Sequence, residues 1–415
     1  MKVNLLLLIA IIIMTVNSNA QVITSGDITV HIDSIINEIP GATPEGLYLQ
    51  PGASSRALWR GVIQGILSGD YAAANMQASG INYQVVQFTD NSVTPAKVYY
   101  ILERTPESTS RYWGTYVFNP APARSKLVIQ CPHPKYDRNT GKQGFRVFYQ
   151  AGARAYFVAG IHRCNGITFS SCDGTTTACS EESEAYRYSD QPHVVLGTFQ
   201  ITTEEMLAVI PDMIVVQPHG FSQDSGDPDI IMSNGTYFTP EIDYLLNLRD
   251  NLLTQDASLT FKVAHIDLEW TKLVARTNTQ GRLINNSPDP CGTYATSVTG
   301  RFLHLEQTYS GLRDTEANWQ KLVNAVIMTF PDDCGCYPGD ANNSGAVNIL
   351  DATYIINYLY RGGLPPSPYA TCSGDANCNG GVNIMDATYL INYLYKNGPA
   401  PCSCLIWTAD YGAPY

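Results

Sequence analysis

Short apolar runs alternate with helix-like patterns through residues 126–330 of the chain. The runs are rich in Val, Ile, Leu and Phe, and the longer segments between them place apolar residues on one face of a helix. The predicted strands are 126–130, 155–159, 213–217, 259–266 and 300–305, and the predicted helices are 141–151, 202–209, 241–253 and 316–330. This alternation predicts an α/β domain with a mostly parallel central sheet and flanking helices.

Two further patterns precede this domain. Residues 83–88, 97–103 and 112–118 are rich in Val, Tyr and Ile and predict a β-rich N-terminal lead-in. Residues 1–20 begin with a charged start, continue with the apolar run 5–14 and end in Ser18-Asn19-Ala20. That order is typical of a cleaved signal peptide, and the run is shorter than the ~20 residues that span a bilayer. We therefore expect a secreted, extracellular protein without a membrane span.

A duplicated segment lies near the C-terminus. Residues 339–363 (GDANNSGAVNILDATYIINYLYRGG) and 374–398 (GDANCNGGVNIMDATYLINYLYKNG) repeat one unit. Each copy places oxygen-bearing side chains at positions 1, 3, 5, 9 and 12 of a loop, with Gly345 or Gly380 at position 6. The predicted Ca²⁺ ligands are Asp340, Asn342, Ser344, Asn348 and Asp351 in the first loop, and Asp375, Asn377, Asn379, Asn383 and Asp386 in the second. Two bound Ca²⁺ ions are therefore expected.

Each loop is followed by an amphipathic helix, at 352–360 and 387–395, and we expect no helix before either loop. A doubled loop-then-helix unit resembles the dockerin domain. The resemblance implies docking to a cohesin module on a scaffold or cell surface, with Ile349-Leu350 and Ile384-Met385 facing the partner. The alternative is a pair of calcium-stiffened repeats with no partner.

We therefore expect a signal peptide (1–20), a large α/β domain (21–333), a small all-α calcium-binding dockerin (334–404) and a C-terminal tail (405–415). Eleven cysteines fit an oxidising compartment. We expect Cys334 and Cys336 to pair with Cys402 and Cys404, and Cys372 and Cys378 are candidates for a local bridge. In the large domain we expect a bridge among Cys164, Cys172 and Cys179. The odd cysteine is expected at Cys131, as a buried thiol unless it is bridged to Cys291.

Histidines follow several predicted strands of the large domain. His133 and Asp137 come after 126–130, His162 after 155–159 and His219 after 213–217, whereas His304 and Glu306 alternate on the last strand. Because the carboxyl ends of parallel strands form one rim, these side chains are expected to gather there. Imidazole nitrogens with one carboxylate predict a zinc site with an open position for water.

We take His133, Asp137 and His219 as the Zn²⁺ ligands and Glu306 as the catalytic general base. His193 and Asp190 are the substitutes for Asp137. The order of a Pro-His pair, an acidic residue, a His-containing turn and a Glu followed by Arg313 resembles the N-formylglutamate amidohydrolases. Zinc-dependent murein amidases and carboxypeptidase-like exopeptidases share that layout. The resemblance implies zinc-dependent hydrolysis of an amide C–N bond in a small amide or peptide substrate.

Several polar residues at the same rim are candidates for substrate binding, because arginine and amide groups hold carboxylates through paired hydrogen bonds. These are Arg163, Asn278, Arg282 and Arg313. The alternative for each arginine is an ordinary salt bridge. The chain has 37 acidic and 25 basic residues, a net charge of −12, and no basic cluster, which argues against a nucleic-acid partner. Two other functions stay open: a ligand-binding module without turnover, and a glycoside hydrolase acting through two carboxylates.

Overall fold

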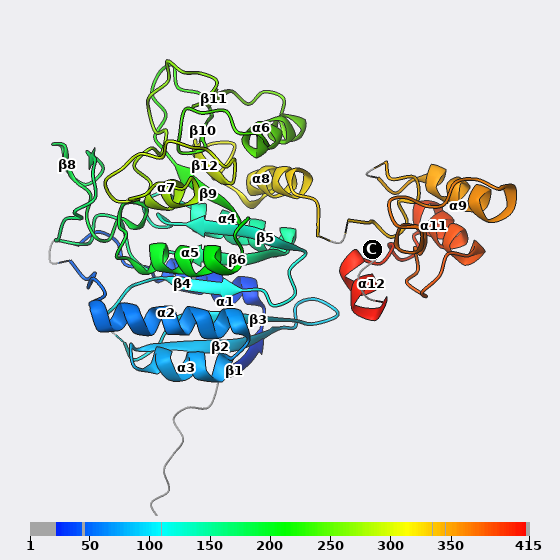
Figure 1. Cartoon of the computed structure of the whole chain (residues 1–415), viewed down its shortest axis with the longest axis horizontal. Coiled ribbons are helices and arrows are strands. Elements are labelled where there is room, and N and C mark those ends of the chain that lie inside the picture. Colours follow the sequence, from blue (N-terminus) through cyan, green and yellow to red (C-terminus); the bar gives the residue numbers. More distant parts are fainter. Residues whose placement is uncertain (1–21, 44–45, 109, 334, 345, 412–415) are drawn as a thin grey trace, which may run out of the picture.

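The computed structural model describes residues 22–43, 46–108, 110–333, 335–344 and 346–411. The expected signal peptide and Cys334 lie outside the described residues. A ten-stranded sheet in the order β1-β2-β3-β4-β6-β5-β9-β12-β10-β11 runs through the large domain (Figure 1). Its strands are β1 (Val22–Gly26), β2 (Tyr83–Asp90), β3 (Lys97–Arg104), β4 (Thr115–Phe118), β5 (Arg124–Cys131), β6 (Ala153–Val158), β9 (Ile214–Gly220), β10 (Ile230–Ser233), β11 (Phe261–Val263) and β12 (Phe302–Gln307).

The four central strands, β6, β5, β9 and β12, are parallel to one another. Nearly all of their residues are buried, which explains their continuous apolar runs. Antiparallel pairings occur on both sides of this centre, at β2–β3, β3–β4, β4–β6 and β10–β12. The expected parallel sheet is thus confirmed at the centre, where the carboxyl ends of parallel strands meet.

Helices cover both faces of the sheet (Figure 1). One face packs against α1 (Ile28–Asn37), α4 (Thr140–Ala151), α6 (Tyr244–Gln255) and α8 (Glu316–Thr329). The other packs against α2 (Ala53–Ser68), α3 (Tyr71–Ser79), α5 (Thr198–Val209) and α7 (Thr279–Ile284). A hairpin of β7 (Thr175–Thr176) and β8 (Glu184–Ala185) and a 3₁₀ turn, η1 (Gln191–His193), lie in the long segment between β6 and α5. Two apolar cores around one sheet make the expected α/β domain.

The lead-in contains its predicted strands and, in addition, three helices that the sequence pattern did not reveal. Ile28, Ile32 and Ile36 lie on the buried face of α1, four residues apart. We also predicted a strand over 259–266, but the strand found there, β11, is three residues long. Beyond Val263 the backbone turns.

The turn also affects His265, Asp267 and Glu269, whose alternation in the sequence predicts that they share one exposed face of a strand. His265 is buried, and its Nε2 lies 2.7 Å from Asp243 Oδ2. Asp267 accepts a hydrogen bond from the backbone N–H of Val263 within the turn. Alternation along the sequence therefore does not put these side chains on one face.

The C-terminal module contains α9 (Ile349–Arg361), α10 (Ala370–Gly374), α11 (Ile384–Lys396) and α12 (Cys404–Tyr411). Helices α9 and α11 follow the two loops, and their residues Ile355 and Leu390 belong to one small apolar core. The short helix α10 directly precedes the second loop, where we expected none; it is a little over one turn long.

Part of the expected tail is the helix α12, whose Trp407 is buried. The indole Nε1 of Trp407 donates to Asp375 Oδ2 at 2.9 Å. Helix α12 therefore packs on the second loop and belongs to the module.

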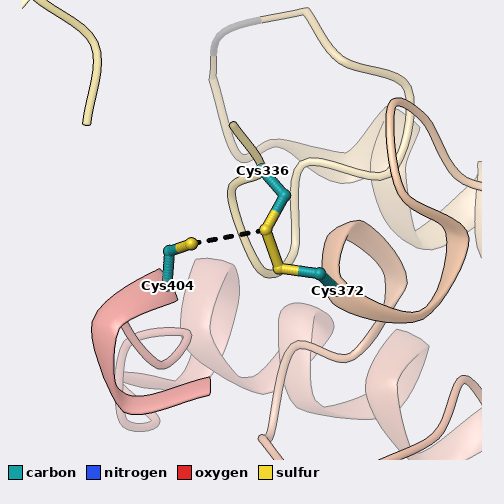
Figure 2. A group of neighbouring side chains, drawn as sticks. All are labelled: Cys336, Cys372 and Cys404. Carbon is teal, nitrogen blue, oxygen red and sulfur yellow. Dashed lines mark hydrogen bonds between the residues drawn. A yellow bond between two sulfur atoms is a disulfide. The ribbon is translucent and has the colours of Figure 1, made fainter. Parts of the chain in front are cut away.

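Disulfides link the module differently from our expectation. Cys336 pairs with Cys372, and Cys378 pairs with Cys402. Cys404 is also disulfide-bonded, and its Sγ lies 3.3 Å from Cys336 Sγ (Figure 2). The expected bridge from Cys336 to Cys402 or Cys404 is therefore wrong, as is a Cys372–Cys378 bridge.

Across the described residues, no helix combines the length and the apolar character that crossing a membrane requires.

Candidate functional site

Three neighbouring strands position the predicted metal ligands and base. Strand β5 ends at Cys131, shortly before His133, whereas His219 and Glu306 belong to β9 and β12. In the sheet register Glu306 lies opposite His219, and His304 lies opposite Gln217. Because β5, β9 and β12 are adjacent and parallel, these side chains meet at one rim.

His133, Asp137 and His219 point at a common centre. His133 Nδ1 lies 3.3 Å from Asp137 Oδ2, His219 Nδ1 lies 3.2 Å from the same oxygen, and the two Nδ1 atoms are 3.2 Å apart. A backbone hydrogen bond of 2.8 Å from Asp137 N to His133 O closes the turn that brings Asp137 back beside His133. This turn explains how Asp137, four residues after His133 in a Pro-containing loop, faces the same centre as His133.

The triangle of donor atoms fits a zinc ion. Tetrahedral ligands at 2.0–2.1 Å from Zn²⁺ stand about 3.3–3.4 Å from one another, close to the three separations found here. All three side chains are buried, and two nitrogens with one carboxylate oxygen form a donor set that open zinc sites use. His133, Asp137 and His219 could therefore hold the ion together.

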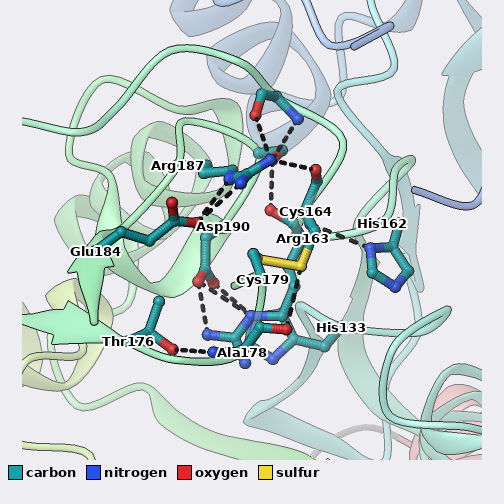
Figure 3. The surroundings of a disulfide bond; sticks show 12 residues. His133, His162, Arg163, Cys164, Thr176, Ala178, Cys179, Glu184, Arg187 and Asp190 are labelled. Carbon is teal, nitrogen blue, oxygen red and sulfur yellow. Dashed lines mark hydrogen bonds and ion pairs between the residues drawn. A yellow bond between two sulfur atoms is a disulfide. The ribbon is translucent and has the colours of Figure 1, made fainter. Parts of the chain in front are cut away.

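The outer nitrogens of both histidines have acceptors. His133 Nε2 lies 2.7 Å from Asp190 Oδ1, and His219 Nε2 lies 3.3 Å from Gln217 Oε1. Arg163 donates to the other oxygen of Asp190 through Nε and Nη2, at 3.1 and 2.6 Å (Figure 3). Asp190 thus orients His133 from outside the donor triangle, as carboxylates commonly do for zinc-binding histidines. In this position Asp190 is not a substitute ligand.

Electrostatics keep Asp137 and His219 in the protonation states that a cation needs. Burial alone would raise the pKa of Asp137, but His133 and His219 outweigh it and hold that pKa well below its usual range. Burial lowers the pKa of His219 to about 4, so its imidazole is neutral at pH 7. An ionised carboxylate and a neutral imidazole are both competent ligands.

Glu306 is buried beside this triangle. Burial, and then the charge of Asp137, raises the pKa of Glu306 well above its usual range, whereas Arg163 and Arg313 oppose the shift. Its Oε1 lies 3.6 Å from His304 Nε2, and its Oε2 has no hydrogen-bond partner among the described residues. A buried carboxylate oxygen without a hydrogen-bond partner is suited to accept a proton from a bound water molecule or substrate.

A cavity of about 1360 Å³ opens over the donor triangle. Its lining includes four arginines, Arg138, Arg163, Arg276 and Arg313, and three carboxylates, Asp137, Asp224 and Glu306. Asp137 faces the two histidines, and Asp224 pairs with Lys272 at 2.8 Å. The positive charge of the four arginines therefore dominates the lining, which favours a substrate that carries negative charge.

The two predicted substrate-binding arginines that line the cavity are already bonded within the protein. Arg163 is held by Asp190, and Arg313 donates to the carbonyls of Gln307, Thr308 and Arg138. These bonds leave each guanidinium fixed in direction at the cavity wall. A fixed guanidinium loses little further conformational entropy when it binds a ligand.

Asn278 and Arg282, the other two candidates, are placed differently. Asn278 lines the cavity, but both ends of its amide have protein partners. Arg282 is not among the described lining residues; it is buried and bonded to Asp173 and to the carbonyls of Arg276 and Cys291. Arg282 therefore forms an ordinary salt bridge, which is the alternative to substrate binding.

Two other histidines of the expected rim stand apart from the triangle. His193 lines the cavity, where its ring stacks on Tyr186 and its Nδ1 lies 3.0 Å from the carbonyl oxygen of Thr277. His162 is outside the described lining, and its Nδ1 accepts from the backbone N–H of Cys164.

Arg276, the first residue of the polar segment 276–282 that also supplies Asn278 and Arg282, lines the cavity as well. Its guanidinium lies over the rings of Tyr237 and Tyr294, 5.1 and 4.2 Å from their centres. Both tyrosines are distant in sequence, and no motif marks the contact.

Two disulfides hold the wall of the cavity. Cys164–Cys179 ties the segment after Arg163 to residues 175–178 of the lining, which confirms the expected loop bridge (Figure 3). Cys172–Cys291 joins the same loop to the segment after α7. Cys131 is the free cysteine among the described residues and is buried as expected, so its bridge to Cys291 is ruled out.

The C-terminal loops fit calcium. The carboxylates at positions 1 and 12 of both loops are buried: Asp340, Asp351, Asp375 and Asp386. Burial raises the pKa of Asp386 to about 6, a cost that a bound cation would offset. Asn377, at position 3 of the second loop, has a buried Oδ1 without a hydrogen-bond partner in the described chain. An orphaned oxygen among buried carboxylates is what a hard cation would satisfy.

Comparison with solved structures gives distant neighbours. The N-formylglutamate amidohydrolase from Ralstonia eutropha JMP134 is 12% identical, with a TM-score of 0.29, over 52% of this chain and 96% of that one. The metallo-carboxypeptidase from Burkholderia cenocepacia is 11% identical, with a TM-score of 0.29, over 68% of this chain and 69% of the other. Thrombin activatable fibrinolysis inhibitor is 11% identical, with a TM-score of 0.30, over 72% and 82%. At such low identities and TM-scores these structures do not indicate which reaction this chain catalyses.

None of the curated protein sequences matches the chain. Residues 338–398 match the dockerin type I domain, which confirms the family that the duplicated loop-helix unit resembles.

Proposed function

We propose that the protein is a secreted, zinc-dependent hydrolase of amide C–N bonds that a calcium-loaded dockerin attaches to a cohesin-bearing scaffold. The observation that carries the enzyme half is the triangle of His133 Nδ1, Asp137 Oδ2 and His219 Nδ1, with Glu306 on the neighbouring strand. The scaffold half rests on the dockerin type I match. Disulfides in both parts of the chain agree with an extracellular location.

A zinc ion bound by these three ligands would polarise a substrate carbonyl and bring the pKa of water close to 7. Glu306 would accept the proton of the attacking water at its unpartnered Oε2 and return it to the leaving nitrogen. The raised pKa of Glu306, which burial causes, strengthens it as a proton acceptor. Arg163 and Arg313 would orient a negatively charged substrate within the cavity.

Of the two other functions, the glycoside hydrolase finds less support in the cavity. That reaction needs two carboxylates on opposite sides of a glycosidic bond. In the described lining, Asp137 is held by two histidines and Asp224 by Lys272, so Glu306 is left as the one carboxylate with a buried oxygen that has no partner. A ligand-binding module without turnover stays the alternative that the experiment must separate.

Metal analysis of the full chain tests the proposal. We expect one zinc per chain after dialysis against calcium-containing buffer, and none in His219→Ala, because removing one of three ligands opens the site. His162→Ala is the matched control, since His162 follows a neighbouring strand and lies outside the described cavity lining.

Hydrolysis is measured on the same samples. The zinc-loaded chain should cleave N-acyl amino acids or short peptides in a substrate panel, and His219→Ala should not. Zinc without any hydrolysis would favour the binding module, and absence of zinc from the wild-type chain would refute the proposal.

A further inference from the structure

We propose that helix α12 is part of the second calcium site. In this site Trp407 is a positioning residue for Asp375, the ligand at loop position 1, and its contact makes the second loop bind Ca²⁺ more tightly than the first. The inference goes beyond the dockerin match, which ends at residue 398, whereas α12 begins at Cys404. It rests on the calcium-binding half of the proposed function and is independent of the zinc site.

The carboxylate of Asp375 is held by three N–H donors. Asn379 N donates to Oδ1 at 2.9 Å, and Gly380 N donates to Oδ2 at 2.8 Å. Trp407 Nε1 also donates to Oδ2, at 2.9 Å, and its side chain is buried. Because a carboxylate oxygen has two lone-pair sites, both sites of Oδ2 are filled, and among the described residues Oδ1 keeps one for a cation. The three bonds therefore fix which oxygen of Asp375 meets the ion.

Tyr411, one turn after Trp407 on α12, contacts the middle of the same loop. Its hydroxyl donates to Cys378 O at 3.0 Å, and Cys378 has a φ of 53°, in the left-handed region that few non-glycine residues adopt. The tyrosine ring packs on Gly380, where an added Cβ atom would lie 2.8 Å from Tyr411 Cε1. Helix α12 thus contacts the second loop at positions 1, 4 and 6.

A disulfide anchors the segment that leads into α12. Cys402 is bonded to Cys378, and Cys402 N donates to Ala376 O at 3.2 Å. The helix therefore begins beside the loop. Because the segment between this anchor and Trp407 is short, bringing the indole onto Asp375 costs little chain entropy.

The chain leaves both loops along the same path at first. The two copies of the repeat are offset by 35 positions. The hydrogen bond from Cys402 N to Ala376 O has a counterpart at this offset, from Ser367 N to Ala341 O at 3.0 Å. Residues after each loop can therefore be compared position by position.

Further along this path the side chains differ. At the same offset Trp407 corresponds to Cys372, and Tyr411 corresponds to Ala376. Cys372 is disulfide-bonded to Cys336, so its sulfur has no hydrogen to donate, and an alanine side chain has no polar group. The corresponding positions thus supply the first loop with neither an indole N–H nor a tyrosine hydroxyl.

Ligand charge does not distinguish the two loops. Each has aspartates at positions 1 and 12 and neutral side chains at positions 3, 5 and 9. Calcium affinity depends on ligand charge and on the rigidity of the site, so rigidity is the term that differs. Ligands that are held in place before the ion arrives lose less conformational entropy when it binds. We therefore expect the second loop to fill at lower calcium concentrations than the first.

Single-loop variants of the full chain measure each site separately. Asp340→Ala leaves the second loop intact and Asp375→Ala leaves the first, and the Kd for Ca²⁺ is measured by competition with a chelator. We expect the Kd of the second loop to be lower by about tenfold or more. Adding Trp407→Phe to Asp340→Ala should raise the Kd of the second loop about 10–100-fold, the range for loss of an outer partner of a metal ligand.

Trp407→Phe combined with Asp375→Ala is the matched control, because the same side chain is changed while the first loop alone binds calcium. Its Kd should stay within about twofold of the value for Asp375→Ala, as for independent sites. A general loss of stability would instead weaken both loops, so this comparison separates positioning of Asp375 from a purely structural role of the indole.

Replacing Trp407 by β-(3-benzothienyl)alanine decides the role of the N–H even if Trp407→Phe fails to fold. This side chain keeps the shape of the indole and has sulfur in place of the N–H, so it should also raise the Kd of the second loop. An unchanged Kd overturns the proposal, as do equal Kd values for the two loops or a loss that both loops share. A wild-type chain that binds no calcium would refute the calcium sites together with this inference, whereas the other three results refute the inference alone.

Discussion

Glu306→Gln should lower the rate of amide hydrolysis by about 10²–10⁴-fold while the zinc content stays at that of the wild-type chain. Glutamine has the shape of glutamate but cannot accept the proton of the attacking water. Glu306 is buried and its Oε2 has no partner among the described residues, so another carboxylate cannot easily replace it. The measurement is kcat on the best substrate of the panel, together with zinc per chain.

Asp224→Asn is the control for this prediction. Asp224 lines the same cavity, but it is exposed and pairs with Lys272, so the rate should change by no more than a few-fold. Loss of zinc in Glu306→Gln would contradict the role of Glu306 as the general base. Ligand atoms of His219, His304 and Glu306 also lie within 4.8 Å of one another, and such a loss would make Glu306 a metal ligand rather than the base.

The rim of the sheet could be predicted because it depends on local patterns. His133 and His219 each follow, or end, an apolar run long enough to be a buried strand, and parallel strands place such ends together. The register of the sheet then sets Glu306 on β12 opposite His219 on β9. Three residues far apart in sequence could therefore be brought together by reasoning about strand ends alone.

What could not be predicted depends on contacts between distant loops. Asp190 lies 57 positions after His133, within the long segment between β6 and α5, and the sequence suggests it as a substitute metal ligand rather than as the partner of His133 Nε2. Arg282 resembled a rim residue because it stands in a polar, turn-rich segment. Its salt bridge to Asp173 depends on a loop that the Cys172–Cys291 disulfide brings beside α7.

The lead-in shows a different limit. Helices α1 and α2 have apolar residues at helical spacing, but the same residues are β-branched and aromatic, as in strands. Ile28, Ile32 and Ile36 are helical here because Asp27 caps α1 through its side chain and the apolar face packs on the sheet. Tertiary packing decides such segments, and a single sequence does not reveal it.

Asp340→Ala combined with Asp375→Ala should abolish calcium binding by the full chain. We expect titration calorimetry to give two Ca²⁺ per wild-type chain, one for each single variant and none for the double variant. Each aspartate stands at position 1 of its loop, and each accepts a backbone N–H from position 5, at 2.9 Å in both loops. Because ligand charge sets calcium affinity over several orders of magnitude, losing one carboxylate should weaken a loop about a hundredfold or more.

Tryptophan fluorescence separates the two loops. Trp407 is the one tryptophan beyond residue 319 in the sequence, and its indole donates to Asp375 Oδ2 at 2.9 Å. Calcium entering the second loop should therefore change the emission of Trp407, in the wild-type chain and in Asp340→Ala but not in Asp375→Ala. Trp407→Phe identifies that signal against the tryptophans of the large domain.

Asp410→Ala is the control for both calcium measurements, because it removes an exposed acidic side chain of the same module that belongs to neither loop. It should leave two Ca²⁺ sites and the Trp407 signal intact. Two calcium ions bound by the double variant would refute the ligand assignment, because no other residues of the loops supply a carboxylate at position 1.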